Sequence, residues 1–338
     1  MSEHSKYITP FTARNIVLGF FIAIFMAILI FFLIPYLITN KTWGWDYNQE
    51  TGVMGDTIGG IAGPIVGFIG IILTFLAFYI QYQANQIQIN ALEKQKDSAD
   101  AQEKQILLQQ FENNFFELLK IHRENVSELR YRKNQGRNVM ISIVNEFFEI
   151  MQEVLDSEII RNNRLEEHDL ANISYIILFF GTDDSVEDVL ENRLFEKYTN
   201  IYNSIKDIID ELRNSPNPYN TEKYYYNGHQ SHLGHYYRHL FRTVLFVHRN
   251  KNLTTNQKKD YIRILRAQLS NHEQVLLFFN SISDLGAAWE LGENVADDEK
   301  LITQYHLIKN IPLGSIYGFN PKKYYPKIKL EHDFEIKL

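Results

Sequence analysis

Histidines gather in one short part of the chain. Five of the 11 histidines lie between His229 and His248. On a helix, His232, His235 and His239 point roughly the same way, and the i, i+4 spacing of the last two can hold a divalent metal ion. No glutamate stands beside that pair as a zinc peptidase requires. The pattern favours buried, hydrogen-bonded histidines or a polar interaction face over a metal site. If a metal does bind, His235 and His239 are the candidate ligands.

A second pattern on the same predicted helix could carry nuclease chemistry. Arg242 and His248 are separated by five residues, and Thr243 follows the arginine. This resembles the loose Arg-to-His signature of HEPN ribonucleases. Histidine can move protons at an RNA 2′-hydroxyl, and arginine can stabilise charge on phosphate. Arg238 and His239 are further candidates for such chemistry. The competing interpretation is a solvated helix face.

A third polar group follows the histidines, and it comprises Arg266, Gln268, Ser270 and Glu273. Arg266 and Glu273 lie two helical turns apart on one predicted face, so with Ser270 they could form an internal polar network. The alternative is a ligand or nucleotide pocket that also includes Tyr236, Arg238 and His239.

Composition excludes several classes of site. The chain has no cysteine, so disulfides and thiolate metal sites are ruled out. Its formal net charge of -7 gives no overall basic footprint for nucleic acid. The sequence contains no Gly-x4-Gly-Lys-Ser/Thr loop, no Rossmann glycine fingerprint and no serine elbow. We therefore expect no cofactor and favour a protein that is not an enzyme, a metal-independent nuclease being the alternative.

Two uncharged apolar runs stand near the N-terminus, Ile16 to Ile38 and Thr57 to Ile80. Each exceeds the roughly 20 residues that a helix needs to cross a bilayer core. They predict a transmembrane hairpin over residues 1–82, with spans at about 16–38 and 57–80 and the lipid bilayer as a partner.

The charges around these runs predict the orientation of the hairpin. Two cations precede the first run and three follow the second: Lys6, Arg14, Lys94, Lys96 and Lys104. The loop between the runs has one cation against three acids: Lys41, Asp46, Glu50 and Asp56. Because cytoplasmic flanks are enriched in Lys and Arg, both termini are predicted to be cytoplasmic.

A glycine repeats at every fourth residue of the second run, at Gly55, Gly59, Gly63 and Gly67. Such a stripe lets another helix approach closely in lipid. The partner could be the first span of the same chain or a second copy, which would make the chain a homo-oligomer. Asp56 is predicted to cap the start of this helix, and Pro64 to bend it.

The remaining sequence predicts a mainly α fold. A stalk helix over residues 83–110, continuing to about Arg132, leads into a cytosolic helical domain over residues 111–338. Four segments have helical periodicity: Met140–Leu155, Asp184–Leu212, His232–His248 and Thr255–Ser281. Ile173–Phe180 reads as a buried helix or a strand, residues 213–220 as a loop, and the tail from Pro312 as extended.

Several blocks in this order resemble the phage abortive infection protein family. They are Gly55–Pro64 continuing to Gln81, Phe111–Phe116 with Leu118 and His122, His232–Leu240, Arg266–Ser270 with Glu273 and Asn280, and Tyr305–Asn310. The resemblance implies a protein of the bacterial inner membrane that acts in anti-phage defence, where an infected cell stops growing or dies before the phage matures. It brings no established catalytic residues.

Together these observations predict an effector that damages the inner membrane through self-association. A phage trigger, or a partner protein of the defence system, would repack the cytosolic domain, and the stalk would transmit the change. Two alternatives stay open. One is a membrane-tethered HEPN-like ribonuclease, the only case in which nucleic acid is a partner. The other is a non-catalytic sensor or scaffold of a multi-gene defence system.

Overall fold

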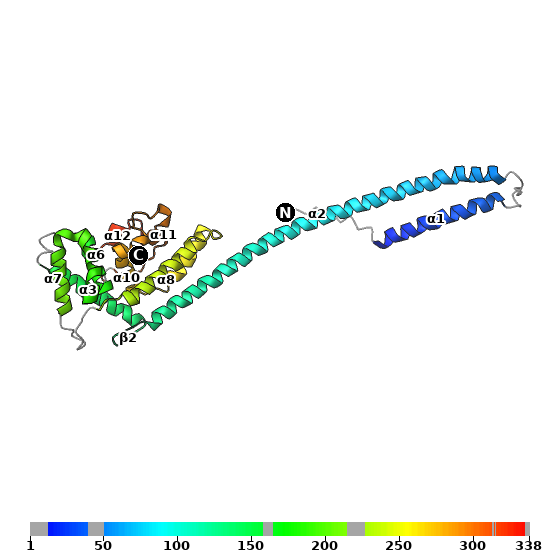
Figure 1. Cartoon of the computed structure of the whole chain (residues 1–338). Helices are drawn as coiled ribbons and strands as arrows, with labels where there is room; N and C mark the ends of the chain where they lie inside the picture. Colours follow the sequence, from blue (N-terminus) through cyan, green and yellow to red (C-terminus); the bar gives the residue numbers. More distant parts are fainter. Residues whose placement is uncertain are drawn as a thin grey trace. The chain divides into compact units, whose positions relative to one another are not determined.

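The computed structural model describes residues 13–39, 51–157, 165–214, 227–312, 314 and 316–334. Over these residues the chain is almost entirely helical, with one two-stranded hairpin (Figure 1). The predicted mainly α fold is confirmed. The chain divides into two units, Met1–Ala101 and Gln102–Leu338. Lys6, Lys41, Asp46, Glu50 and most of the predicted loop at 213–220 lie outside the described residues.

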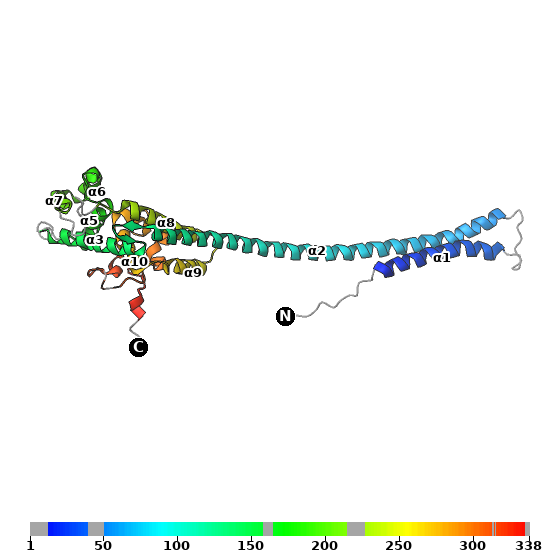
Figure 2. The same cartoon turned by 90° about the horizontal axis from the view of Figure 1, so that it is seen from below.

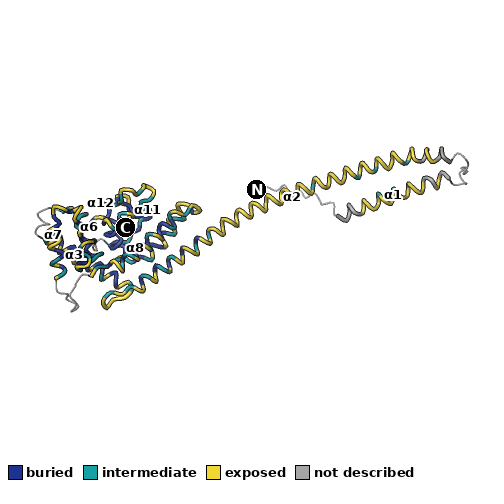
Figure 3. Tube along the Cα trace, in the orientation of Figure 1, coloured by how far each residue is buried: buried dark blue, intermediate teal, exposed yellow. Residues whose placement is uncertain are grey.

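The first unit consists of helix α1 (Ala13–Thr39) and the beginning of helix α2 (Thr51–Glu128). The two helices run side by side in both views (Figures 1 and 2). Among the described residues, α2 from Gly59 onward is the one stretch long and apolar enough to cross a membrane, and α1 holds a shorter apolar stretch, Leu18–Leu33. Apolar side chains on both helices are exposed (Figure 3). The two-span topology and the side of the termini stay predictions.

The four regularly spaced glycines lie on an open face of α2. A methyl group at Gly55, Gly59, Gly63 or Gly67 would meet no atom within 4 Å among the described residues. Packing of α1 against these glycines is therefore not seen. Asp56 does not cap the helix, because α2 already begins at Thr51, and the helix continues through Pro64.

The second unit begins with the last turns of α2, which ends at Glu128, short of the predicted Arg132. The chain turns there into the hairpin of β1 (Arg130–Tyr131) and β2 (Asn134–Gln135). The helices that follow are α3 (Arg137–Asp156), α5 (Glu167–Phe180), α6 (Glu187–Tyr198), α7 (Tyr202–Asn214), α8 (Gln230–His248), α9 (Thr255–Arg266), α10 (Asn271–Ile282), α11 (Leu301–Tyr305) and α12 (Pro321–Tyr324).

Helix α10 is the centre of this unit. Every residue from Glu273 to Ile282 is buried, and the helix packs against α3 and α5. A helix that is buried on all sides is covered by neighbouring elements on all sides. It ends where the 3-10 turn η4 (Asp284–Trp289) folds back over it, and a side chain at Gly286 would overlap the carbonyl oxygen of Asn280. Only glycine fits this approach.

The last turns of α2 belong to the same core. Phe111 and Phe115 are buried with Leu119, and the Phe111 ring lies 5.1 Å from that of Phe246 on α8. The ring of Tyr261 on α9 meets Phe111 edge-on at 4.9 Å. The helix that begins in the apolar N-terminal unit is thus fixed at its other end by aromatic packing.

Two predicted helices are each two helices in the structure. Thr255–Ser281 divides into α9 and α10, because the Ser270 side chain accepts the Glu273 N–H and the Glu273 side chain accepts the Ser270 N–H. This reciprocal capping box starts a new helix. Asp184–Leu212 likewise divides into α6 and α7 around a 3-10 turn, Thr199–Ile201.

The tail from Pro312 is not extended. It contains α12 and a 3-10 turn, Glu331–Phe334, and it buries Tyr325, Ile328 and Leu330. The Tyr325 hydroxyl donates to Ser281 Oγ of α10 at 2.7 Å. The tail packs because its apolar residues complete the cover of α10. Helices α3 and α8 agree with prediction, and Ile173–Phe180 is helical and ends at Gly181.

We predict that replacing Phe115 with alanine lowers the free energy of unfolding of the second unit by about 3–5 kcal/mol, because a fully buried aromatic side chain is removed from a packed core. Thermal unfolding of the detergent-solubilised chain measures this. The neighbouring Phe116, 50% exposed, is the matched control, and Phe116→Ala should change the melting temperature little. Equal losses in the two variants would contradict the packing described.

Candidate functional site at the buried end of α2

A buried histidine of α2 lies among polar side chains of three other helices. His122 is 1% exposed. Its Nε2 is 4.0 Å from Oε1 of Glu273 on α10. Its ring centroid is 5.2 Å from that of Tyr236 and 6.0 Å from that of His239, both on α8. We call this group, with Arg137 at the start of α3, the His122 cluster.

Glu273 is the acid of the cluster, and its carboxylate is well satisfied. Oε2 accepts the Ser270 N–H at 2.7 Å, and Oε1 accepts the Tyr236 hydroxyl at 3.1 Å. Arg137 Nε approaches Oε2 to 4.0 Å from the solvent side, and Arg137 Nη2 donates to the Gln268 carbonyl. A buried carboxylate is tolerated when hydrogen bonds and a cation compensate its lost hydration.

The two histidines of the cluster are held neutral. Burial lowers the pKa of His122 to about 4, and the nearby His239 and Arg137 add to this effect. Burial, with His235 nearby, also lowers the pKa of His239. Both ring nitrogens of His122 and both ring nitrogens of His239 are without a hydrogen-bond partner among the described residues. Unpaired buried donors and acceptors are rare, and among the described residues only these two side chains have two such atoms each.

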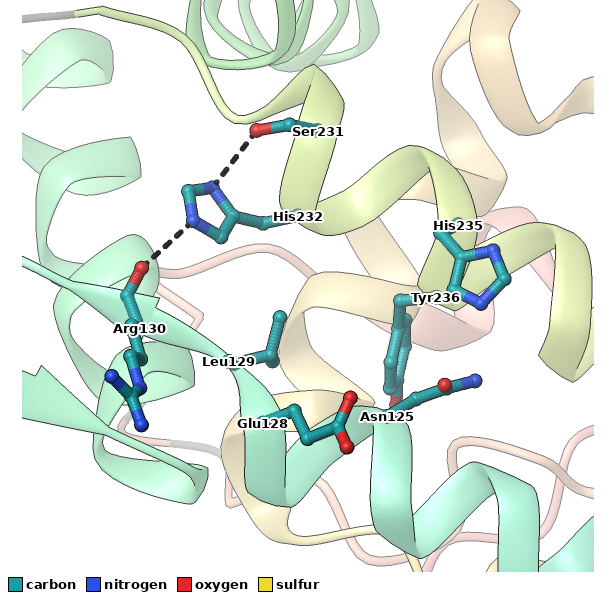
Figure 4. A pocket seen from close by; sticks show the side chains of 8 residues that line it. All are labelled: Asn125, Glu128, Leu129, Arg130, Ser231, His232, His235 and Tyr236. Carbon is teal, nitrogen blue, oxygen red and sulfur yellow. Dashed lines mark hydrogen bonds between the residues drawn. The ribbon is translucent and has the colours of Figure 1, made fainter.

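A pocket of about 370 Å³ opens beside the cluster, between the last turn of α2 and the first turns of α8 (Figure 4). Its lining consists of Asn125, Glu128, Leu129, Arg130, Ser231, His232, His235 and Tyr236. His232 Nε2 lies 3.0 Å from the Arg130 carbonyl oxygen, which joins the start of α8 to β1. Tyr236 both lines the pocket and donates to Glu273, so it connects the pocket to the cluster.

A second buried histidine–glutamate contact lies at the start of α8, next to the pocket residue His232. His229 Nε2 lies 3.2 Å from Glu146 Oε1, and both side chains are at most 3% exposed. The Tyr131 hydroxyl donates to Glu146 Oε2 at 2.7 Å, and Arg132 Nη2 lies 3.6 Å from the same oxygen. These contacts hold the hairpin, α3 and the start of α8 together.

The polar group expected around Arg266 is only partly assembled. Ser270 and Glu273 meet in the capping box, but Arg266 points elsewhere, and its Nη1 donates to the carbonyls of Tyr305 and His306. Gln268 is half-buried and contributes its carbonyl to Arg137. The pocket between α2 and α8 is lined by Tyr236, but not by Arg238, His239 or any residue of the Arg266 group, so it is not the pocket expected from the sequence.

The other candidates on α8 are dispersed. Arg238 and Arg242 are exposed, and Arg238 Nε donates to the Gly234 carbonyl. His248 is half-buried, and its Nδ1 lies 2.9 Å from the Tyr305 hydroxyl. His235 is exposed, while His239 faces His122. Over the described part of the chain, no group of three or more His, Asp or Glu residues is arranged to hold a metal ion.

Sequence reasoning missed the central residues of this site. In the sequence, His122 stands out only within the family-like block that begins at Phe111, and Glu146 and His229 are not singled out. A signal exists for Glu146, since helical spacing places this acid on the same face as the apolar residues Ile143 and Ile150. The distance in sequence between His122, His239 and Glu273 conceals their proximity.

Comparison with known proteins points to one family. A family model described as "Putative phage abortive infection protein" matches residues 228–316, the same family that the residue blocks resemble. The match covers α8 to α11 and starts at the rim of the pocket; it does not include the blocks at Gly55–Gln81 or Phe111–His122. No curated protein and no solved structure matches the chain.

We predict a pH dependence of stability that originates in His122. The folded-state pKa is about 4, below the ordinary value of 6.5, so between these values the unfolded chain binds a proton that the folded chain does not. Stability is therefore full above pH 6.5 and falls as the pH drops toward 4, by roughly 2 kcal/mol at pH 5.

Melting temperatures of the wild type and His122→Phe at pH 7.5, 6 and 5 test this. The variant should lose less stability between pH 7.5 and 5 than the wild type, whatever its absolute melting temperature. Parallel pH profiles would show that His122 takes up its proton equally easily in the folded and unfolded chain.

Proposed function

We propose that the chain is a membrane-anchored effector of anti-phage abortive infection, which arrests or kills the infected cell by acting on the inner membrane through self-association. The family match at residues 228–316 supports the defence role. The mechanism rests on one observation: α2 is a single helix from the glycine-bearing apolar stretch to the aromatic core of the second unit.

The folded end of α2 is where a trigger would act. Phe111, Phe115 and His122 fix the helix in the core, and the pocket is lined by Asn125 and Glu128 from its last turn. A phage component or a partner protein that binds at this pocket contacts α2 directly. Repacking at the pocket alters the folded end of α2. The stalk, residues 83–110 of the same helix, transmits this change toward the bilayer.

The apolar end of α2 is where the damage would arise. Small residues on one face allow close helix contact in lipid, where van der Waals packing drives association. Among the described residues nothing lies within 4 Å of a Cβ atom at Gly55, Gly59, Gly63 or Gly67, which leaves this face available to a second copy. In this scheme the chain is a homo-oligomer of the bacterial inner membrane with both termini in the cytoplasm.

The alternatives have less support. A tethered nuclease needs Arg242 and His248 at one accessible site, but His248 is bound to Tyr305. A scaffold that recruits a separate killer would give no protection when this chain is expressed alone. The experiment below distinguishes all three mechanisms.

We predict that the double variant Gly59→Leu, Gly63→Leu abolishes protection against phage at an unchanged protein level. A Cβ atom at these positions meets no described atom of the chain within 4 Å, whereas the branched leucine side chain prevents close approach of a second helix. Plating efficiency, membrane potential by voltage-sensitive dye and total RNA integrity are measured in phage-challenged cells. The wild type should depolarise early with intact RNA, and the variant should not depolarise.

Two matched variants control for side-chain size and for position. Gly59→Ala, Gly63→Ala keeps the face small and should retain most protection, and Phe68→Leu on the opposite side of α2 should retain it fully. Full protection by the leucine double variant would refute self-association through this face. RNA breakage before any depolarisation would support the nuclease instead, and failure of the wild-type chain alone to protect would support the scaffold.

A further inference from the structure

The block Tyr305–Asn310, which the proposed mechanism does not use, forms an unusual turn directly after α11. His306 has a left-handed backbone conformation, with φ of 50°. A residue other than glycine adopts this conformation at a cost, and such residues concentrate at functional sites. The turn therefore needs a reason beyond chain reversal.

Hydrogen bonds from two other segments fix this turn. Arg266, at the end of α9, donates from Nη1 to the carbonyls of Tyr305 and His306, both at 3.1 Å. The Lys329 backbone N–H donates to His306 Nδ1 at 3.3 Å. Because Nδ1 accepts a hydrogen bond, the neutral ring carries its proton on Nε2, which becomes a donor.

Positive charge converges on His306. The Lys309 N–H donates to the His306 carbonyl at 3.1 Å, and Arg266 and Lys329 reach the same residue through the hydrogen bonds above. Burial lowers the pKa of the ring, and the charges of Arg266, Lys329, Lys259 and Lys309, from three separate segments, add to this effect. Arg263, also close to Arg266, is paired with Asp260 at 3.2 Å, and Glu331 is an acid whose charge acts on Arg266. In a chain with a net charge of -7, so many cations around one neutral ring form a local positive field.

We propose that His306, together with Arg266, Lys259, Lys309 and Lys329, binds a phosphate group. We call these residues the His306 site. A guanidinium, lysine ammonium groups and an imidazole N–H are the donors that phosphate oxygens accept, and an anion relieves the repulsion among the cations. The phosphate belongs either to a free phosphorylated molecule or to a lipid headgroup. The site is separate from the pocket at α8 and from the glycine face of α2, so it does not depend on the proposed membrane mechanism.

Calorimetric titration of the full chain in a maltoside detergent, which contains no phosphate, tests the proposal. Sodium phosphate and short-chain phosphatidylglycerol are titrated separately, with sodium chloride at matched ionic strength as the blank. We expect saturable binding of at least one of the two. The variant Lys259→Gln, Lys329→Gln should weaken it at least tenfold, since both side chains are exposed and removable without unfolding, which the melting temperature checks.

Lys133→Gln, in the turn of the hairpin, is the matched control and should bind as the wild type does. Binding of sodium phosphate alone assigns a free phosphorylated ligand, binding of phosphatidylglycerol alone assigns a headgroup, and binding of both assigns the shared group. Absence of saturable binding for both probes, or equal binding by the Lys259→Gln, Lys329→Gln variant, overturns the proposal. The assay involves no infection, so its failure is distinct from failure of the effector mechanism.

Discussion

The second unit is organised around the buried carboxylate of Glu273. This one group caps the central helix α10 through Ser270, accepts the hydroxyl of Tyr236 from α8 and faces His122 of α2. A charge in this position is stable only while each partner is present, because its hydration is lost. The packing of α2, α8 and α10 is therefore tied to a single ionised group, and the low pKa of His122 follows from the same burial.

Local patterns in the sequence predict much of the fold. The periodicity of Met140–Leu155 and of His232–His248 predicts α3 and α8, and Gly181 ends α5 as glycine does in many helices. The sequence also contains a signal for the break before α10, because Ser270 and Glu273 have capping-box spacing. The apolar periodicity on either side obscures this signal. The packing of the tail could not be predicted from the sequence. Its apolar residues stand singly among lysines and prolines, and they become buried only by contact with α10.

The site was less predictable than the fold. Placing Arg266 and Glu273 on one face assumes a continuous helix, and the capping box that separates α9 from α10 removes that premise. The His122 cluster joins residues more than a hundred positions apart, and no local spacing encodes such contacts. Charges show the same limit, because a net charge of -7 conceals the cations gathered at His306.

Gly286 shows what distant relatives of this chain would have to keep. Its backbone lies so close to the end of α10 that any side chain would overlap Asn280, whose own side chain accepts a hydrogen bond from Trp289. Histidines and lysines on a surface can be exchanged as ligands and partners change, but this contact leaves no room for exchange. A glycine in this place, with a tryptophan three residues later, is thus a more durable marker of shared ancestry than the polar residues of the surface.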